Sequence, residues 1–167
     1  MAIYMKIKGI DGHVTTKGYE NWIELQNFNF NVSRNLSTTT GNVADRERTK
    51  PTLSELTINK EIDKTTPDLF SAACGTREGG KAIDEIDIHV CHTSGDSVKP
   101  YIEYKLNNVL LSNYQIQGDK KCETSRPAET IALNYDKIQM NFTTHDEKHS
   151  SGSPARAGYD LKAGTKV

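Results

Sequence analysis

Apolar residues recur at every second position in several segments of this chain. Period-two alternation is the pattern of a half-buried β-strand. The first such run alternates Ile3, Met5 and Ile7 with Tyr4 and Lys6. Further runs cover residues 23–25, 28–32, 56–58, 86–90, 102–106, 109–111, 131–135 and 138–142. The chain is therefore predicted to be mainly β.

The alternation changes phase at three places: between residues 25 and 28, at residues 107–108 and at residues 136–137. A slip of one residue moves every later side chain to the opposite face of a sheet. A β-bulge inserts one extra residue into a strand, which produces this change of face and bends the strand. The alternative is a pair of short strands and a turn at each change. Bulges are favoured because the three sites lack the glycine typical of a tight hairpin, and bent strands are typical of barrels and sandwich corners.

One short helix is predicted, beginning at Thr66-Pro67-Asp68. Thr66 is the expected N-cap, Pro67 suits the first helical position, and Asp68 is favourable in the first turn. The apolar face would comprise Leu69, Phe70, Ala73 and Cys74. Gly75 is expected to end the helix.

A chain of 167 residues fits a single domain over residues 1–167. Two segments lack periodicity: a polar, extended loop at about residues 34–52 and a loop-like C-terminal tail at about 144–167. Within that tail, residues 158–161 are expected to return to the fold. A long loop in a compact domain is often functional.

Charge excludes two classes of partner. The net charge is -1, with 26% charged residues and a pI of about 6.5. This balance lacks the basic excess of a nucleic-acid binder or of a protein held on an anionic membrane. No apolar run approaches the roughly 18 residues of a membrane helix, and the N-terminus lacks the apolar core of a signal peptide. Three scattered cysteines, Cys74, Cys91 and Cys122, favour a reducing cytosol over a disulfide framework.

Candidate chemistry is sparse. Residues 75–81 have the glycine and lysine spacing of a phosphate-binding loop, but Ala82 stands where that motif needs Ser or Thr. The segment also runs from helix to strand, whereas a phosphate loop runs from strand to helix. Two groups could suggest a metal: His145 with His149, and His89 with Cys91 and His92. Solvent-facing polar positions explain them better, so no enzyme activity, metal or cofactor is expected.

Several blocks taken together resemble the Hcp family, the haemolysin-coregulated tube proteins of type VI secretion systems. The blocks are residues 5–12 (MKIKGIDG), 22–25 (WIEL) with Phe28 and Phe30, 63–70 (DKTTPDLF), 109–114 (VLLSNY), 126–138 (RPAETIALNYDKI) and 158–161 (GYDL). Many family members carry Trp at the positions of Phe28, Phe30 and Tyr159. The resemblance spans nearly the whole chain, in the family's order.

The resemblance implies a fold of two packed antiparallel sheets forming a β-barrel-like domain with one short helix, similar to phage tail-tube proteins. It implies homohexameric rings that stack into a tube inside a contractile sheath, tipped by a VgrG-like spike protein. It also implies secreted effectors as cargo, with the protein in the bacterial cytoplasm before firing and secreted without a signal peptide.

Two sets of site residues follow as expectations. The 34–52 loop is expected to reach a neighbouring subunit or ring, with Thr39, Asp45, Arg46, Glu47 and Arg48 at that interface. A wide channel must stay wet, so polar strand residues should line it, with Ser33, Asn107 and Ser112 as candidates.

Two alternatives stay open. One is a secreted β-sandwich binding module that uses Tyr4, Tyr19 and Tyr101 as a surface platform. The other is a divergent Hcp paralogue that acts as an effector carrier. A binding module would be monomeric or dimeric, whereas a tube protein would form six-fold rings.

Overall fold

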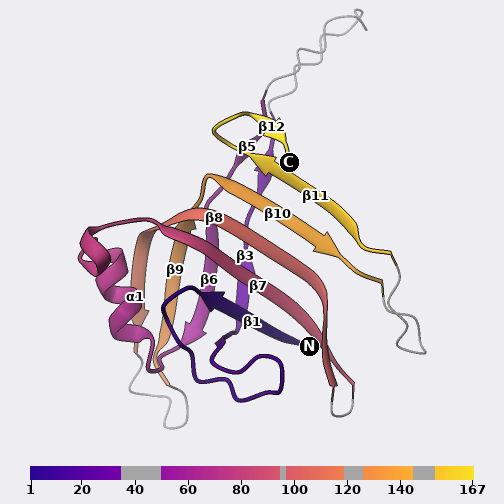
Figure 1. The fold of residues 1–167 in the computed structure, drawn as a ribbon. Helices are drawn as coiled ribbons and strands as arrows, with labels where there is room; N and C mark the ends of the chain where they lie inside the picture. The colour runs from indigo at the N-terminus through magenta and orange to yellow at the C-terminus, as the bar shows by residue number, and fades with distance from the viewer. Residues whose placement is uncertain (35–49, 95–96, 119–125, 145–152) are drawn as a thin grey trace, which may run out of the picture.

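A computed structural model describes residues 1–34, 50–94, 97–118, 126–144 and 153–167. The prediction of a mainly β fold with antiparallel sheets and one short helix is confirmed (Figure 1). No helix among these residues is long and apolar enough to cross a membrane.

The larger sheet runs in the order β12-β11-β10-β8-β7-β1-β2, with every neighbouring pair antiparallel. Its strands are β1 (Ala2–Ile7), β2 (Ile23–Leu25), β7 (Ile83–Ser94), β8 (Ser97–Gln117), β10 (Lys137–Phe142), β11 (Ala155–Asp160) and β12 (Thr165–Lys166). The long β7–β8 pair forms its centre (Figure 1).

The second sheet runs in the order β3-β6-β9-β8 and takes the C-terminal part of β8 as its last strand. The other strands are β3 (Asn27–Asn29), β6 (Leu56–Glu61) and β9 (Ala128–Asn134). A separate two-stranded sheet pairs β4 (Val32–Ser33) with β5 (Thr52–Leu53). Because β8 belongs to both larger sheets, the domain is barrel-like at this corner.

The first phase change marks a passage between the sheets. The predicted single bent strand is wrong here, because β2 and β3 are separate strands that pair with β1 and β6. Only Gln26 lies between them, and its backbone N–H donates to the backbone carbonyl of Asn59 at 2.8 Å. The chain therefore changes sheets without a reversing turn.

The other two phase changes lie side by side at the shared corner. The bent strand predicted at residues 107–108 is confirmed, since β8 runs unbroken through Asn108, whose φ is +53°. The register shift itself lies a few residues later, between Leu111 and Asn113. At residues 135–136 the chain instead breaks between β9 and β10, and both strands continue along β8.

The main core lies between the two larger sheets, where the alternating apolar side chains of both meet. Its fully buried members include Met5, Ile7, Ile23, Leu56, Ile58, Ile86, Ile88, Leu106, Ile131 and Leu133. Burying each such side chain contributes about 1.5–3 kcal/mol. The period-two pattern of the sequence therefore supplies most of the core.

The helix α1 (Thr66–Ala73) forms where predicted, with Cys74 as its C-cap and Gly75, whose φ is +68°, directly after it. A short 3-10 turn, η1 (Arg77–Gly79), follows it. The N-cap is Thr65, so the prediction of Thr66 is wrong by one residue. No side chain caps the helix, because the Thr65 hydroxyl donates to the Asp63 carboxylate instead.

The C-terminal part of the chain is more ordered than the predicted loop-like tail. Residues 155–160 form β11 on the edge of β10, and β12 pairs with β11 in turn. The expected return of residues 158–161 is thus part of a longer strand pair. The predicted loop residues Thr39, Asp45, Arg46, Glu47 and Arg48 lie outside the described residues, as do Cys122, His145 and His149.

A small second core lies on the outer face of β1 and β7, under the segment 10–22. Tyr4 stacks on Tyr19 with ring centroids 4.8 Å apart, and Trp22 contacts Tyr19 edge-on. Cys91 is fully buried among them. The solvent-facing interpretation of Cys91 is therefore wrong, because the sequence does not show that this segment folds back over the sheet.

The imidazole of His89 lies in this cluster. Its Nδ1 lies 3.1 Å from the Tyr19 hydroxyl and its ring contacts Trp22. Burial lowers the pKa of His89, although the carboxylates of Glu103 and Asp87 oppose this effect. The folded protein thus binds this proton less readily than the unfolded chain does.

We expect the free energy of unfolding to fall as pH drops below the unfolded-state pKa of about 6.5. Urea unfolding of wild type and His89→Gln at pH 7.5 and 5.5 measures the contribution. The wild type should lose more stability than the variant, and His92→Gln, at an exposed position, should behave as wild type. An equal pH dependence in wild type and His89→Gln would contradict the expectation.

Candidate assembly surfaces

The outer face of the second sheet carries amide and hydroxyl side chains in register. We call it the amide face and define it by Asn27, Asn29, Thr57, Asn59, Asn113, Gln115 and Thr130. Asn27 pairs with Asn59, Asn59 with Thr130, and Thr130 with Gln115, so one row crosses all four strands.

Hydrogen bonds join the first three members of this row. The Asn59 amide donates to Asn27 Oδ1 at 2.6 Å, and the Thr130 hydroxyl donates to Asn59 Oδ1 at 2.5 Å. The row has no ionisable side chain. Amides both donate and accept hydrogen bonds. The uncharged side chains of this row can therefore form hydrogen bonds with water or with a polar partner.

The outer face of the larger sheet differs in charge. Lys105 lies 3.0 Å from Glu85 and 3.7 Å from Asp87, and Lys6 lies 2.9 Å from Asp11. The two outer faces of the domain are therefore chemically distinct: the amide face is dominated by uncharged hydrogen-bonding side chains, with Glu61 at its edge, and the other face carries charges of both signs.

The three predicted channel residues lie in different places. Ser112 stands at the register shift of β8 beside the amide face, and its hydroxyl donates to the Ala132 carbonyl at 3.3 Å. Asn107 lies in the larger sheet, between Glu85 and Lys137. Ser33 is in β4 of the two-stranded sheet. Their place relative to a channel stays a prediction.

Ser112 is among the predicted channel residues, but the amide face itself is not predicted from the sequence. Its signal was present, because Asn27 and Asn29 flank Phe28, and Thr57 and Asn59 flank Ile58. The missing information was the pairing of four strands distant in sequence, which brings these polar positions into common rows.

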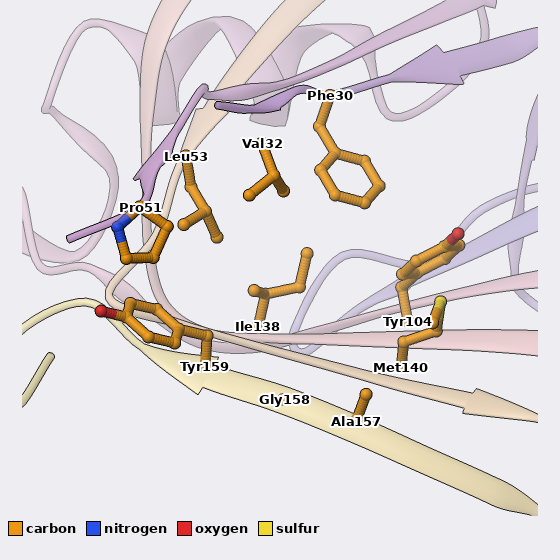
Figure 2. Close-up of a pocket in the computed structure, with 10 residues that line it drawn as sticks. All are labelled: Phe30, Val32, Pro51, Leu53, Tyr104, Ile138, Met140, Ala157, Gly158 and Tyr159. Carbon is orange, nitrogen blue, oxygen red and sulfur yellow. The ribbon is translucent and has the colours of Figure 1, made fainter. Parts of the chain in front are cut away.

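An apolar groove opens between the β4–β5 pair and strands β10 and β11 (Figure 2). Its lining comprises Phe30, Val32, Pro51, Leu53, Tyr104, Ile138, Met140, Ala157, Gly158 and Tyr159. The groove is continuous with the core, because Tyr104 and Ile138 are core residues and Phe30 contacts the Tyr104 ring edge-on at 5.6 Å. In effect, the space between the sheets stays open to solvent at this end.

The groove has a volume of about 320 Å³. An apolar cavity of about 150 Å³ holds a benzene molecule, so an aromatic side chain fits here. Phe30 and Tyr159 face each other across it (Figure 2). Val32 and Met140 on its walls remain substantially exposed, which is costly for apolar groups in water.

A second apolar surface lies on the opposite flank of the domain, at α1 (Figure 1). We call it the α1 patch and define it by Phe70, Tyr114 and Ile116. Phe70 is 56% exposed and Ile116 is 53% exposed. The Phe70 ring packs edge-on against Tyr114 with centroids 5.8 Å apart.

A buried ionic cluster lies beneath this patch. Lys60, with no exposed surface, donates to Glu129 Oε2 at 2.7 Å, to Asp63 Oδ1 at 2.9 Å and to the Glu61 carbonyl at 2.7 Å. Glu129 is also fully buried, and its Oε1 accepts the Tyr114 hydroxyl at 2.7 Å. The cluster therefore fixes the ring of Tyr114 from below.

Asp63 connects this cluster to the surface. Burial opposes its ionisation, but hydrogen bonds from Thr65 and Lys60 outweigh burial and lower the pKa of Asp63. Its other oxygen lies 3.0 Å from His13 Nδ1. Among the residues that the structure describes, no group of three His, Cys, Asp or Glu side chains is arranged to hold a metal.

The prediction of a surface platform of three tyrosines, expected for a binding module, is wrong for two of them. Tyr4 and Tyr19 are buried against each other in the second core, and only Tyr101 is partly exposed. Aromatic side chains that are packed on one another cannot stack on a ligand.

Comparison with known proteins agrees with this fold. The family model described as "Type VI secretion system effector, Hcp" matches residues 4–142. The protein hcp1 of Pseudomonas aeruginosa is 24% identical over 114 residues, which are 68% of this chain and 67% of that protein.

Solved structures share the architecture. One described as a type six secretion system protein has a TM-score of 0.89 at 24% identity, over 99% of both chains. Hcp1 from Salmonella typhimurium has a TM-score of 0.78 at 21% identity, over 99% of this chain and 98% of its own. A type VI secretion system effector from Yersinia pestis has a TM-score of 0.73 at 20% identity, over 95% and 98%. Because the family model spans most of the chain and the same fold recurs in these structures, the protein belongs to the Hcp family of type VI secretion systems.

Proposed function

We propose that this chain is a structural subunit of the inner tube of a type VI secretion system. Six copies form a ring, rings stack, and the tube is expelled with bound effectors into a target cell. Its partners in this role are further copies of itself, the contractile sheath, a VgrG-like spike protein and secreted effectors. The protein waits in the bacterial cytoplasm and leaves through the secretion system.

The observation that supports this role, beyond family membership, is the amide face. A wide channel through a ring needs a wall that stays wetted, and an apolar wall would collapse or bind cargo irreversibly. A wall of amides and hydroxyls offers exchangeable hydrogen bonds and no strong field. The row Asn27–Asn59–Thr130–Gln115 has this chemistry across the full width of the sheet.

We therefore place the amide face, with Ser112 beside it, on the channel wall. The charged outer face of the larger sheet then lies elsewhere on the ring, where ion pairs remain in contact with solvent or with the sheath. A structural role of this kind requires no catalytic residue.

The mass of the purified protein in solution tests the proposal. Light scattering after gel filtration should give six times the 18.6 kDa of the chain, and negative-stain images of the same peak should show rings with a central hole. A folded monomer at all concentrations measured would contradict a tube role and favour a binding module or a divergent paralogue that carries effectors.

A further inference from the structure

We propose that segment 10–22, here called the cover, closes over the second core at neutral pH and opens at acidic pH while the two larger sheets stay folded. The cover leaves the end of β1 and returns to the start of β2 (Figure 1). This inference goes beyond the proposed function and does not depend on it, because it concerns a device within one copy of the chain.

The backbone of the cover is hydrogen-bonded to itself. The Gly12 N–H donates to the Asn21 carbonyl at 2.9 Å, and the Asn21 N–H donates to the Val14 carbonyl at 2.8 Å. The Val14 N–H donates to the Trp22 carbonyl at 3.1 Å. Because these bonds close within the cover, it can lift without breaking the ladder between β1 and β7.

Residues in the left-handed region stand near both ends of the cover. Gly9 has φ of +81° directly before it, and Asn21 has φ of +62° near its end. Loop residues of this kind absorb the backbone rotation when a segment swings about a hinge. The Arg77 guanidinium donates to the Gly9 carbonyl at 2.8 Å and fixes the first of these points to η1.

Ion pairs hold the first part of the cover. Lys6 Nζ lies 2.9 Å from Asp11 Oδ1, and His13 Nδ1 lies 3.0 Å from Asp63 Oδ2. A positive charge on the His13 imidazole strengthens the second contact. Acid therefore does not release this end.

The rest of the cover rests on His89 and its aromatic neighbours. The Tyr19 hydroxyl lies 3.1 Å from His89 Nδ1, and the Trp22 ring centroid lies 4.7 Å from that of the imidazole. From β1, Tyr4 stacks on Tyr19, and fully buried Cys91 completes the second core. His89 is thus the side chain in this core whose charge changes in mild acid.

The groups that face His89 act in opposite directions. Burial beneath the cover lowers the pKa of His89 most strongly, and Lys105 acts in the same sense. Glu103, with Oε1 4.0 Å from Nε2, and Asp87 raise it, and the Trp22 ring also favours a cation. Burial prevails, so the closed cover disfavours the proton, and opening returns the imidazole to water.

A proton on His89 consequently favours the open cover. The opening equilibrium rises by up to about tenfold per pH unit below about 6.5, until the closed form also titrates. Opening uncovers Tyr4, Trp22 and Cys91. Acid thus exposes an apolar surface at this position on the outer face of the larger sheet.

Hydrogen exchange measured by mass spectrometry at pH 7.5 and 5.5, corrected for the intrinsic rate at each pH, tests the proposal on the full chain. Protection of residues 12–22 should fall by up to about tenfold, and that of β1 and β7 should stay higher. Acrylamide quenching of Trp22, the single tryptophan, should rise while the far-UV circular dichroism is unchanged. His89→Gln should abolish both changes, and His92→Gln, at an exposed position of the same strand, should retain them.

Three results would overturn the proposal: no change in wild type, the same change in His89→Gln, or equal protection of the cover and of β1 and β7 at pH 5.5. The last would mean that the chain opens only as a whole. His13→Gln should keep the acid response, and its loss there would move the switch from His89 to His13. His89→Asn replaces His89→Gln if that variant fails to unfold cooperatively.

Discussion

Replacing Lys60 with Met should destabilise the protein by about 3–5 kcal/mol, because it leaves buried carboxylates without their cation. Lys60 and Glu129 are fully buried, with 2.7 Å between the ammonium nitrogen and Oε2. Asp63 loses the same partner, at 2.9 Å. The methionine side chain matches the lysine stem in shape, so the loss reports the missing charge more than a cavity.

Urea unfolding at one fixed protein concentration measures this effect, since self-association would add concentration-dependent stability. The double variant Lys60→Met, Glu129→Leu removes the fully buried pair together and should recover part of the loss, because Asp63 still lacks its cation and the Tyr114 hydroxyl loses its acceptor. A change below about 1 kcal/mol in the single variant would show that the cluster is solvated in solution.

Gly12→Ala should cost about 1–3 kcal/mol, as is typical of overpacking a filled site. A methyl group at residue 12 would overlap the Trp22 carbonyl and lie 2.7 Å from the Ile23 amide nitrogen. Both neighbours are backbone, so neither can move aside as a side chain could. The Gly12 amide also donates to the Asn21 carbonyl at 2.9 Å, which fixes the segment in place.

Trp22 is the single tryptophan of the chain, so its fluorescence reports this region directly. The variant should show a red-shifted emission and a lower urea midpoint. Gly118→Ala is the control, because its methyl group would only reach ordinary contact with Pro127 at 3.7 Å, and it should stay within about 0.5 kcal/mol of wild type. An unchanged midpoint for Gly12→Ala would mean that segment 10–22 moves freely.

The burial of Lys60 could not be predicted from the sequence. It continues the alternation of Leu56 and Ile58 and therefore falls on the core face of β6. A lone lysine in a sequence is nonetheless expected in solvent, because burying an unpaired charge is very costly. Its partner Glu129 lies 69 residues away, and only strand pairing reveals it.

The sequence by itself determined the helix, the fold class and most of the strands, although β11 and β12 lie in the segment predicted to be a loop-like tail. Period-two alternation sorts residues such as Met5, Ile88 and Ile131 to one side of a strand, and that sorting is a local property. The sequence also contained enough family-specific blocks to identify the family. The sequence determined the bends of the strands only in part. Asn107-Asn108 marked a corner of β8, but residues 25–28 did not reveal that the chain passes from one sheet to the other.

Only the tertiary structure decided the surfaces. The amide face exists because four strands, with members as distant in sequence as Asn27 and Thr130, align their polar positions. The groove exists because the β4–β5 pair lies opposite strands β10 and β11, which leaves Phe30 and Tyr159 facing each other. Tyr4 and Cys91 are buried because a distant segment covers them. Each of these features is a juxtaposition of residues remote along the chain, and strand pairing and register, which no local pattern encodes, bring them together.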